Sequence, residues 1–193
     1  MDARTLIDKL AKANIPYESV ADTLDFVYAL ANDRPIWIDN KPSRYYSFNN
    51  MPQDSFTDIM LEQIAEALRK SKQAEGITLF HGYVTDKGMK LFIDALKETK
   101  APISELCIDD LQGITDASLK DLPAIIKTKG IAKCDVSGYL KISDNLKQEI
   151  NKATAEVRKS MFDKGKSTLK QKKNNSNQIK RFLRKILDKD KKL

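Results

Sequence analysis

The sequence predicts an α/β fold made of about four stacked strand–turn–helix units. An apolar residue, a Thr or Ser and an Asp recur together at Phe56-Thr57-Asp58, Val84-Thr85-Asp86, Ile114-Thr115-Asp116 and Ile142-Ser143-Asp144. Counted from the Thr or Ser, the spacings are 28, 30 and 28 residues. Such a period indicates a stacked array, because one unit cannot bury both its strand and its helix face, whereas neighbouring units share one core.

A helix is expected after each copy of this segment. The stretches that follow have apolar residues at the spacing of one helix face: LEQIAEAL, MKLFIDAL, LKDLPAII and LKQEINKA. The Thr or Ser suits the N-cap, where its hydroxyl accepts a backbone N–H, and the Asp suits the positive end of the helix dipole. Pro123 lies inside the third stretch, so that helix is expected to be short or kinked.

A short strand is expected before each helix. Apolar or alternating runs that follow a Gly or Pro break lie at Ile36-Trp37-Ile38, Ile77-Thr78-Leu79, Leu106-Cys107-Ile108 and Cys134-Asp135-Val136. The first run differs from the others, because a long loop separates it from its helix. Stacking of the units would place the four strands side by side and parallel.

The strand regions carry a more specific pattern. Ile103, Leu106, Ile108 and Leu111 are matched 28 residues later by Ile131, Cys134, Val136 and Tyr139. This L-x-x-L-x-L framework, with the V-T-D-K-G of residues 84–88, resembles the ribonuclease-inhibitor-like class of leucine-rich repeats. The resemblance covers roughly residues 35–157 and implies a short right-handed solenoid, with strands on its concave side and helices outside. The alternative is a plain α/β domain with coincidental spacing.

The chain departs from this family at three positions. Leu111 and Tyr139 stand where an Asn or Cys usually bonds the turn backbone, and Ser118 stands where the second unit has the family Gly. The curvature of a long horseshoe therefore does not follow from so few and such irregular units.

Two further regions flank the predicted solenoid. Residues 1–34 contain two helical patterns on either side of Pro16 and are expected to form an N-terminal cap. Residues 158–193 contain fourteen Lys and Arg against three Asp, a charge of +11, whereas residues 1–157 carry −4. This asymmetry predicts a boundary after residue 157 and a separate basic tail.

The basic tail is predicted to hold a linker and an amphipathic helix. Residues 165–178 are rich in Lys, Asn and Ser, and the residues after them place one apolar side on a helix: Ile179, Phe182, Leu183, Ile186 and Leu187. A basic helix of this kind is typical of segments that bind an anionic membrane surface, a partner protein or nucleic acid. The predicted contacts are Lys180, Arg181, Phe182, Arg184 and Lys185. The alternative is that the tail docks on the solenoid as a C-terminal cap or is simply solvated.

Catalytic chemistry is not indicated. His81 is the single histidine, so Cys/His and Ser/His/Asp arrangements would have to converge on it. Cys107 and Cys134 are too few for a disulfide framework or, without other ligands, a zinc site. Asp109 and Asp110 are adjacent strand residues, which face opposite ways. The sequence therefore predicts a protein that is not an enzyme and uses no metal, cofactor or small-molecule substrate.

The strand residues that alternate with core positions are the predicted binding surface. One row is expected to contain Trp37, Thr78, Cys107 and Asp135, and the next Asp39, Phe80, Asp109 and Ser137. Exposed aromatic residues among acids favour protein–protein interaction with a basic or mixed partner surface. The alternative is that the N-terminal helices or the loop 40–53 cover Trp37 and Phe80.

The predicted function is therefore that of an adaptor, scaffold or effector that binds a protein, and the alternative is membrane or nucleic-acid association through the tail. No run approaches the roughly 18 apolar residues of a membrane-spanning helix, and the N-terminus does not resemble a signal peptide. A cytoplasmic location is expected, or secretion into a host cell if the chain is a bacterial effector, a class in which short leucine-rich-repeat proteins occur.

Overall fold

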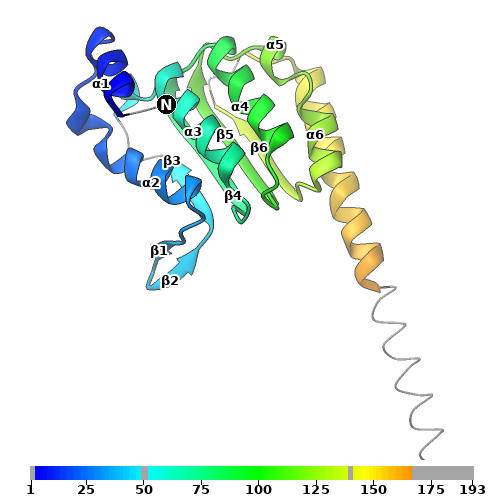
Figure 1. The fold of residues 1–193 in the computed structure, drawn as a ribbon. Coiled ribbons are helices and arrows are strands. Elements are labelled where there is room, and N and C mark those ends of the chain that lie inside the picture. Colours follow the sequence, from blue (N-terminus) through cyan, green and yellow to red (C-terminus); the bar gives the residue numbers. More distant parts are fainter. Residues whose placement is uncertain (1–2, 49–51, 139–140, 167–193) are drawn as a thin grey trace, which may run out of the picture. The chain divides into compact units, whose positions relative to one another are not determined.

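The computed structural model describes residues 3–48, 52–138 and 141–166 (Figure 1). The chain divides into two compact units, Met1–Ala155 and Glu156–Leu193. The first contains both sheets, whereas the described part of the second is helical over residues 156–166. Among the helices of these described ranges, none has the length and apolar character needed to cross a membrane.

The first unit begins with two helices, as the sequence predicted. They are α1 (Ala3–Lys12) and α2 (Ala21–Ala31), joined through the short 3-10 turn η1 (Tyr17–Ser19). Each buries part of one face, because Leu10 of α1 and Leu30 of α2 are at most 2% exposed.

A two-stranded hairpin follows α2. Its strands β1 (Ile36–Ile38) and β2 (Lys41–Ser43) pair antiparallel, with Trp37 opposite Pro42. The turn residues Asp39 and Asn40 have φ values of 49° and 60°, and two positive values are what a tight two-residue hairpin turn requires. The prediction that residues 36–38 form the first strand of the parallel sheet was therefore wrong.

The main sheet is parallel and contains four strands in chain order. They are β3 (Tyr45–Phe48), β4 (Gly76–Tyr83), β5 (Glu105–Gln112) and β6 (Lys133–Ser137). The predicted α/β class and the predicted alignment of Ile77, Leu106 and Cys134 are confirmed, because these residues are paired across β4, β5 and β6. The first position of the sheet is occupied by β3, whose Tyr46 pairs with Ile77.

A helix follows each strand of this sheet. They are α3 (Asp58–Lys70), which follows the 3-10 turn η2 (Gln53–Ser55), α4 (Asp86–Glu98), the pair α5 (Asp116–Leu119) and α6 (Leu122–Lys129), and a helix that starts at residue 144 and continues to 166. The third helix is interrupted as predicted, with Pro123 in the first turn of α6, where its missing N–H has no helical partner.

The core lies between the sheet and these helices. Figure 1 shows α3, α4 and α6 in front of the strands. The strand residues facing them are almost completely buried, among them Ile77, Leu79, Leu106 and Ile108. They meet helix residues such as Ile64 and Phe92, which are also fully buried. Each such aliphatic side chain contributes about 1.5–3 kcal/mol by leaving water.

The Thr/Ser-Asp segments connect one unit to the next. Asp58 accepts hydrogen bonds from the backbone N–H and the hydroxyl of Thr85, at 2.8 and 2.6 Å. Asp86 accepts the same pair of bonds from Thr115, at 2.9 and 2.5 Å, and the backbone N–H of Ser143 donates to Asp116 at 2.7 Å. We call these three connections the Asp ladder. The predicted hydroxyl caps are present at Thr85, at Thr115 and at Ser143, whose hydroxyl accepts from the backbone N–H of Leu146 at 3.2 Å, but not at Thr57.

Ser118, which stands where the preceding unit has Gly88, also belongs to this ladder. Its hydroxyl donates to Asp86 at 2.6 Å, which adds a third bond to the middle connection. The corresponding Gly88 has no room for a side chain, because a Cβ there would lie 2.2 Å from the carboxylate of Asp58. At this position Ser118 donates a hydrogen bond to the Asp of the preceding unit, whereas Gly88 lets the Asp58 carboxylate approach its backbone closely.

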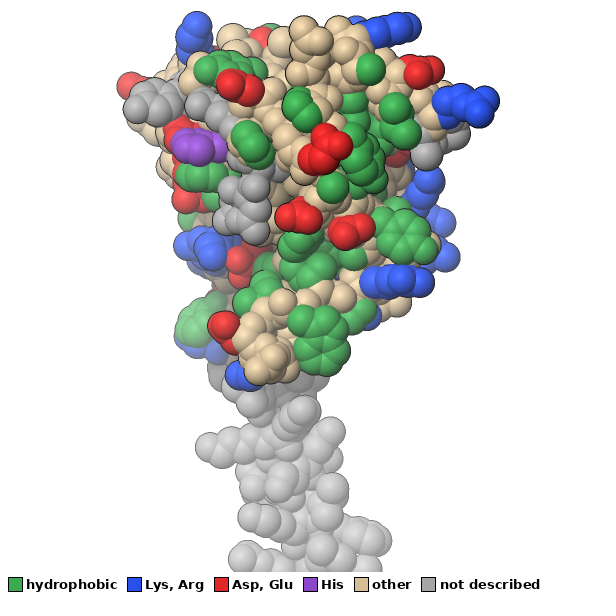
Figure 2. Space-filling model, turned by 90° about the vertical axis from the view of Figure 1, so that its left-hand side faces the viewer, with side chains coloured by type: hydrophobic (Ala, Val, Ile, Leu, Met, Phe, Trp, Pro, Cys, Tyr) green, Lys and Arg blue, Asp and Glu red, His purple; other side chains and the backbone are tan. Residues whose placement is uncertain are grey.

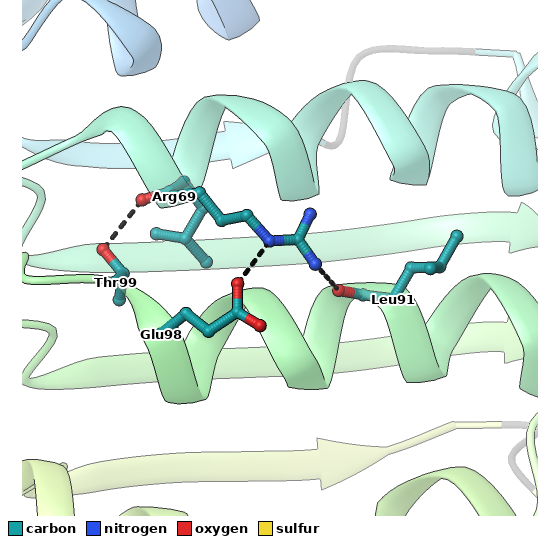
Figure 3. Close-up of polar contacts among 5 residues, drawn as sticks. Arg69, Leu91, Glu98 and Thr99 are labelled. Atoms are coloured by element: carbon teal, nitrogen blue, oxygen red, sulfur yellow. Dashed lines mark hydrogen bonds and ion pairs between the residues drawn. The ribbon is translucent and has the colours of Figure 1, made fainter.

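Side chains also join α3 and α4 at their other ends (Figure 3). The hydroxyl of Thr99 donates to the carbonyl of Leu68 at 2.7 Å in a buried site. Arg69 lies 2.7 Å from the carboxylate of Glu98, and both side chains are substantially exposed. The buried bond therefore contributes more to the alignment of the two helices than the ion pair does.

Candidate partner-binding surface

The outward face of the parallel sheet carries a first row of aligned side chains. Ser47, Thr78, Cys107 and Asp135 are paired in series across the four strands. The first three are partly exposed and Asp135 is exposed, whereas their chain neighbours on the opposite face are mostly buried. The row thus has the expected members except at its start, where Ser47 replaces Trp37.

A second row crosses three strands. Phe80 pairs with Asp109, and Asp109 pairs with Ser137. The hydroxyl of Ser137 donates to Asp109 at 2.9 Å, while the ring of Phe80 stacks on that of His81 with centroids 4.5 Å apart. All three side chains of the row are partly exposed, so acceptor oxygens and an aromatic surface are open to a partner.

Trp37 and Asp39 were wrongly assigned to these rows. Trp37 lies on the β1–β2 hairpin and is 71% exposed, and Asp39 forms the hairpin turn. The signal for the true first strand was the alternating run Tyr45-Tyr46-Ser47-Phe48, which is rich in strand-forming aromatic residues. It was overlooked because it lies within the segment interpreted as a loop.

Just after the second row, β4, β5 and the segment after β6 each have a residue with a positive φ. His81, Asp110 and Gly138 follow the paired residues and have φ values of 55°, 56° and 78°. His81 Nδ1 lies 2.9 Å from an Asp110 carboxylate oxygen. His81 lies inside β4, and His and Asp tolerate the left-handed conformation better than most other residues do.

Two carboxylates and the ammonium of Lys133 act on the Cys107 thiol of this face. Burial, followed by the charges of Asp135 and Asp109, raises the pKa of the Cys107 thiol. Burial also raises the pKa of Cys134, on the opposite face, to about 12. Thiols kept protonated in this way are poor nucleophiles. The carboxylates beside Cys107 are instead suited to accept charge-assisted hydrogen bonds from Lys or Arg.

No group of three or more His, Cys, Asp or Glu is placed to hold a metal ion within the ranges that the structure describes. The predicted tail contacts Lys180, Arg181, Phe182, Arg184 and Lys185 lie outside the described residues. In the described part of the second unit, Met161 and Phe162 are 49% and 62% exposed, and the Lys166 ammonium lies 4.2 Å from the centroid of the Phe162 ring.

Comparison of the sequence with protein-family models and with curated proteins gives no match in either case. The function is therefore inferred from the residues of the chain itself.

Proposed function

We propose that this chain is a protein-interaction module without catalytic activity, and that it binds a basic partner surface through the outward face of its parallel sheet. The observation that carries the proposal is the alignment of partly exposed acidic, hydroxyl and aromatic side chains in two rows. Phe80 offers an aromatic anchor, while Asp109 and Asp135 offer carboxylates on the neighbouring strands.

We also propose that residues 35–157 form a short solenoid of the leucine-rich-repeat kind. Support comes from the parallel strands in chain order, from the helix after each strand, and from the register that joins residues about one repeat apart. The Asp ladder adds a polar connection that recurs at each step from one helix start to the next. In such a solenoid the outward strand face is the binding surface.

The test is affinity purification with chemical cross-linking from cells that express the tagged chain. The double variant Phe80→Ala/Asp135→Arg removes the aromatic anchor and reverses one exposed charge. Asp8→Arg is the matched control, since Asp8 is exposed on α1, outside the sheet. We expect proteins retained by the wild type and by Asp8→Arg, and cross-linked near Asp135, to be lost from the double variant. Equal retention by all three chains would refute the proposal.

A second candidate function is association with an anionic membrane or nucleic acid through the tail. It is favoured by the +11 charge of residues 158–193 and by the exposed Met161 and Phe162. Deletion of residues 167–193 separates the two candidates. Retention of the protein partners, with no change in binding to anionic vesicles or RNA, would eliminate the second.

A further inference from the structure

The β1–β2 hairpin exposes apolar side chains on both of its faces. Trp37 and Ile38 are consecutive strand residues and therefore point to opposite faces, yet they are 71% and 47% exposed. Pro35 and Pro42 are exposed as well. Figure 1 shows the hairpin extending away from the helices and the parallel sheet. The rest of the unit therefore leaves much of both hairpin faces open to a ligand.

The hairpin lies at the edge of the unit where the helices end and the parallel strands begin. Asp33, just before the hairpin, accepts from the backbone N–H of Lys72 at 2.8 Å. The neighbouring loops follow in series, because Ser104 N–H donates to the carbonyl of Glu75 at 2.8 Å and Ala132 N–H donates to that of Ser104 at 2.9 Å. We call these segments together the basic edge: residues 34–44, 69–76, 97–105 and 127–133.

The basic edge is charged oppositely to the unit that carries it. It contains eleven Lys and Arg against four Asp and Glu, whereas residues 1–157 as a whole carry −4. The turns at the other end of the sheet, residues 52–58, 81–87 and 109–116, contain six Asp and a single Lys. Basic residues in the last turn of a helix complement its dipole, but this does not account for Lys41 and Lys72, which lie outside the helices.

Much of this positive charge is open to an anionic ligand. Two of the four acids of the edge, Glu98 and Glu105, already form ion pairs with basic residues of the edge. Lys41, Lys72 and Lys100 are exposed, and among the described residues no carboxylate forms an ion pair with their ammonium groups. Figure 2, which faces the side that carries α1, α2 and the hairpin, shows hydrophobic side chains together with Lys and Arg toward the end where the hairpin lies.

An anionic lipid surface fits both the apolar hairpin and the positive charge. A flat protein surface would cover one face of the hairpin, whereas the headgroup layer of a membrane surrounds an inserted hairpin on both faces. Trp is enriched at the membrane–water interface, and each Lys or Arg near an anionic leaflet strengthens binding about fivefold. The polar turn residues Asp39 and Asn40 limit insertion to the headgroup layer, because a carboxylate is costly in the hydrocarbon core.

We infer that the hairpin and the basic edge bind the surface of an anionic phospholipid membrane. Trp37 and Ile38 enter the headgroup layer, and the Lys and Arg of the edge contact lipid phosphates. This surface belongs to the first unit, so the inference does not require residues 158–193. It is also separate from the outward face of the sheet, and its failure would leave the proposed function untouched.

Trp37 reports directly on this contact, because it is the single tryptophan of the chain. The full chain is mixed with vesicles of equal parts phosphatidylcholine and phosphatidylserine, and separately with vesicles of phosphatidylcholine alone. We expect the anionic vesicles alone to shift the Trp37 emission to the blue and to protect it from acrylamide, and high salt to reduce both effects. Lipids brominated near the headgroup should quench Trp37 more than lipids brominated near the end of the acyl chain.

Charge reversal on the basic edge tests the electrostatic part. Lys41→Glu/Lys72→Glu should lower the vesicle partition constant, measured through Trp37 emission, at least about tenfold. Lys87→Glu/Lys90→Glu is the matched control, since it reverses two exposed charges on α4, outside the edge. The control should retain the wild-type constant within about twofold.

Removal of one exposed Ile tests the apolar part while leaving Trp37 in place. Ile38→Ser should lower the partition constant at least about threefold. Ile7→Ser is the matched control, because Ile7 is 51% exposed on α1 and lies outside the edge. This control should bind as the wild type does.

Four results would overturn the inference. The wild type would fail to bind the anionic vesicles, or it would bind them with unchanged Trp37 emission and acrylamide quenching, which would assign membrane binding to another segment such as the tail. The charge-reversal variant and its control would lose binding equally. A single-stranded RNA oligonucleotide would shift the Trp37 emission where vesicles do not, which would assign the basic edge to nucleic acid.

Discussion

Replacing Asp86 with Ala removes the middle connection of the Asp ladder. The carboxylate accepts three hydrogen bonds from the next unit, from the backbone and hydroxyl of Thr115 and from the hydroxyl of Ser118. A hydrogen bond to a charged group contributes about 1.5–3 kcal/mol, and this half-buried site reduces that value through solvent screening. We expect Asp86→Ala to lower the free energy of unfolding by about 2–4 kcal/mol.

The other two connections of the Asp ladder allow the effect of Asp86→Ala to be compared with those of Asp58→Ala and Asp116→Ala. Asp58 accepts from Thr85 and Asp116 accepts from Ser143, in both cases at exposed sites. Asp86→Ala is therefore expected to destabilise the chain more than Asp58→Ala or Asp116→Ala does. The difference follows from the number of donors and their burial, because all three residues occupy the same place at the start of a helix and share the dipole contribution.

Urea unfolding followed by far-UV circular dichroism measures these differences by linear extrapolation. Lys90→Ala is the control, since Lys90 is exposed on α4, and it should change the free energy by no more than about 0.5 kcal/mol. A loss for Asp86→Ala that equals this control would show that the ladder contributes nothing. A larger loss of unfolding free energy for Asp116→Ala than for Asp86→Ala would refute the explanation by the number and burial of the hydrogen bonds.

Three further predictions concern acid stability, fluorescence and packing. Burial alone raises the pKa of Asp86, but the hydrogen bonds from Ser118 and Thr115 outweigh it and hold the pKa below the usual 3.8. The resulting stabilisation is complete above pH 3.8 and is lost as the pH falls through the folded pKa. Thermal melts should therefore show a shallower acid decline for Asp86→Ala than for the wild type, and identical slopes would contradict this. Trp37 is the single tryptophan and is 71% exposed, so native emission should be red-shifted and readily quenched by acrylamide; protection from the quencher would show that the hairpin is covered. Gly82→Ala would place a Cβ 2.5 Å from the backbone oxygen of Phe56, so we expect a loss of about 1–3 kcal/mol in urea unfolding, and a neutral effect would contradict the close contact.

The repeat made most of the fold predictable. A period near 28 residues predicts the alignment of Ile77, Leu106 and Cys134, because equal numbers of residues per unit bring equivalent positions side by side. The interruption of the third helix at Pro123 likewise followed from the missing backbone N–H. The roles of Asp58, Asp86 and Asp116 were only half predicted. Their place at helix starts was evident from the sequence, but contacts to the next unit depend on side-chain geometry in the stacked array.

The start of the array was not predictable in the same way. Ile36-Trp37-Ile38 has stronger strand character than its surroundings, and it does form a strand, but local preference does not determine the partner of a strand. The turn at Asp39 and Asn40 closes a hairpin within two residues, which removes β1 from the parallel sheet. The edge position of the parallel sheet is taken by β3, so the first row of outward side chains starts with Ser47 and does not include Trp37.

The register that builds the core also determines what a partner would meet on the other face. Neighbouring strands lie about 4.8 Å apart, so equivalent side chains form closely spaced rows. Asp109 and Asp135 are near enough to Cys107 for both charges to act on its thiol. A Lys or Arg from a partner would form charge-assisted hydrogen bonds with these carboxylates. Binding through this face should therefore weaken steeply with salt, whereas a partner held mainly by Phe80 would be almost insensitive to it.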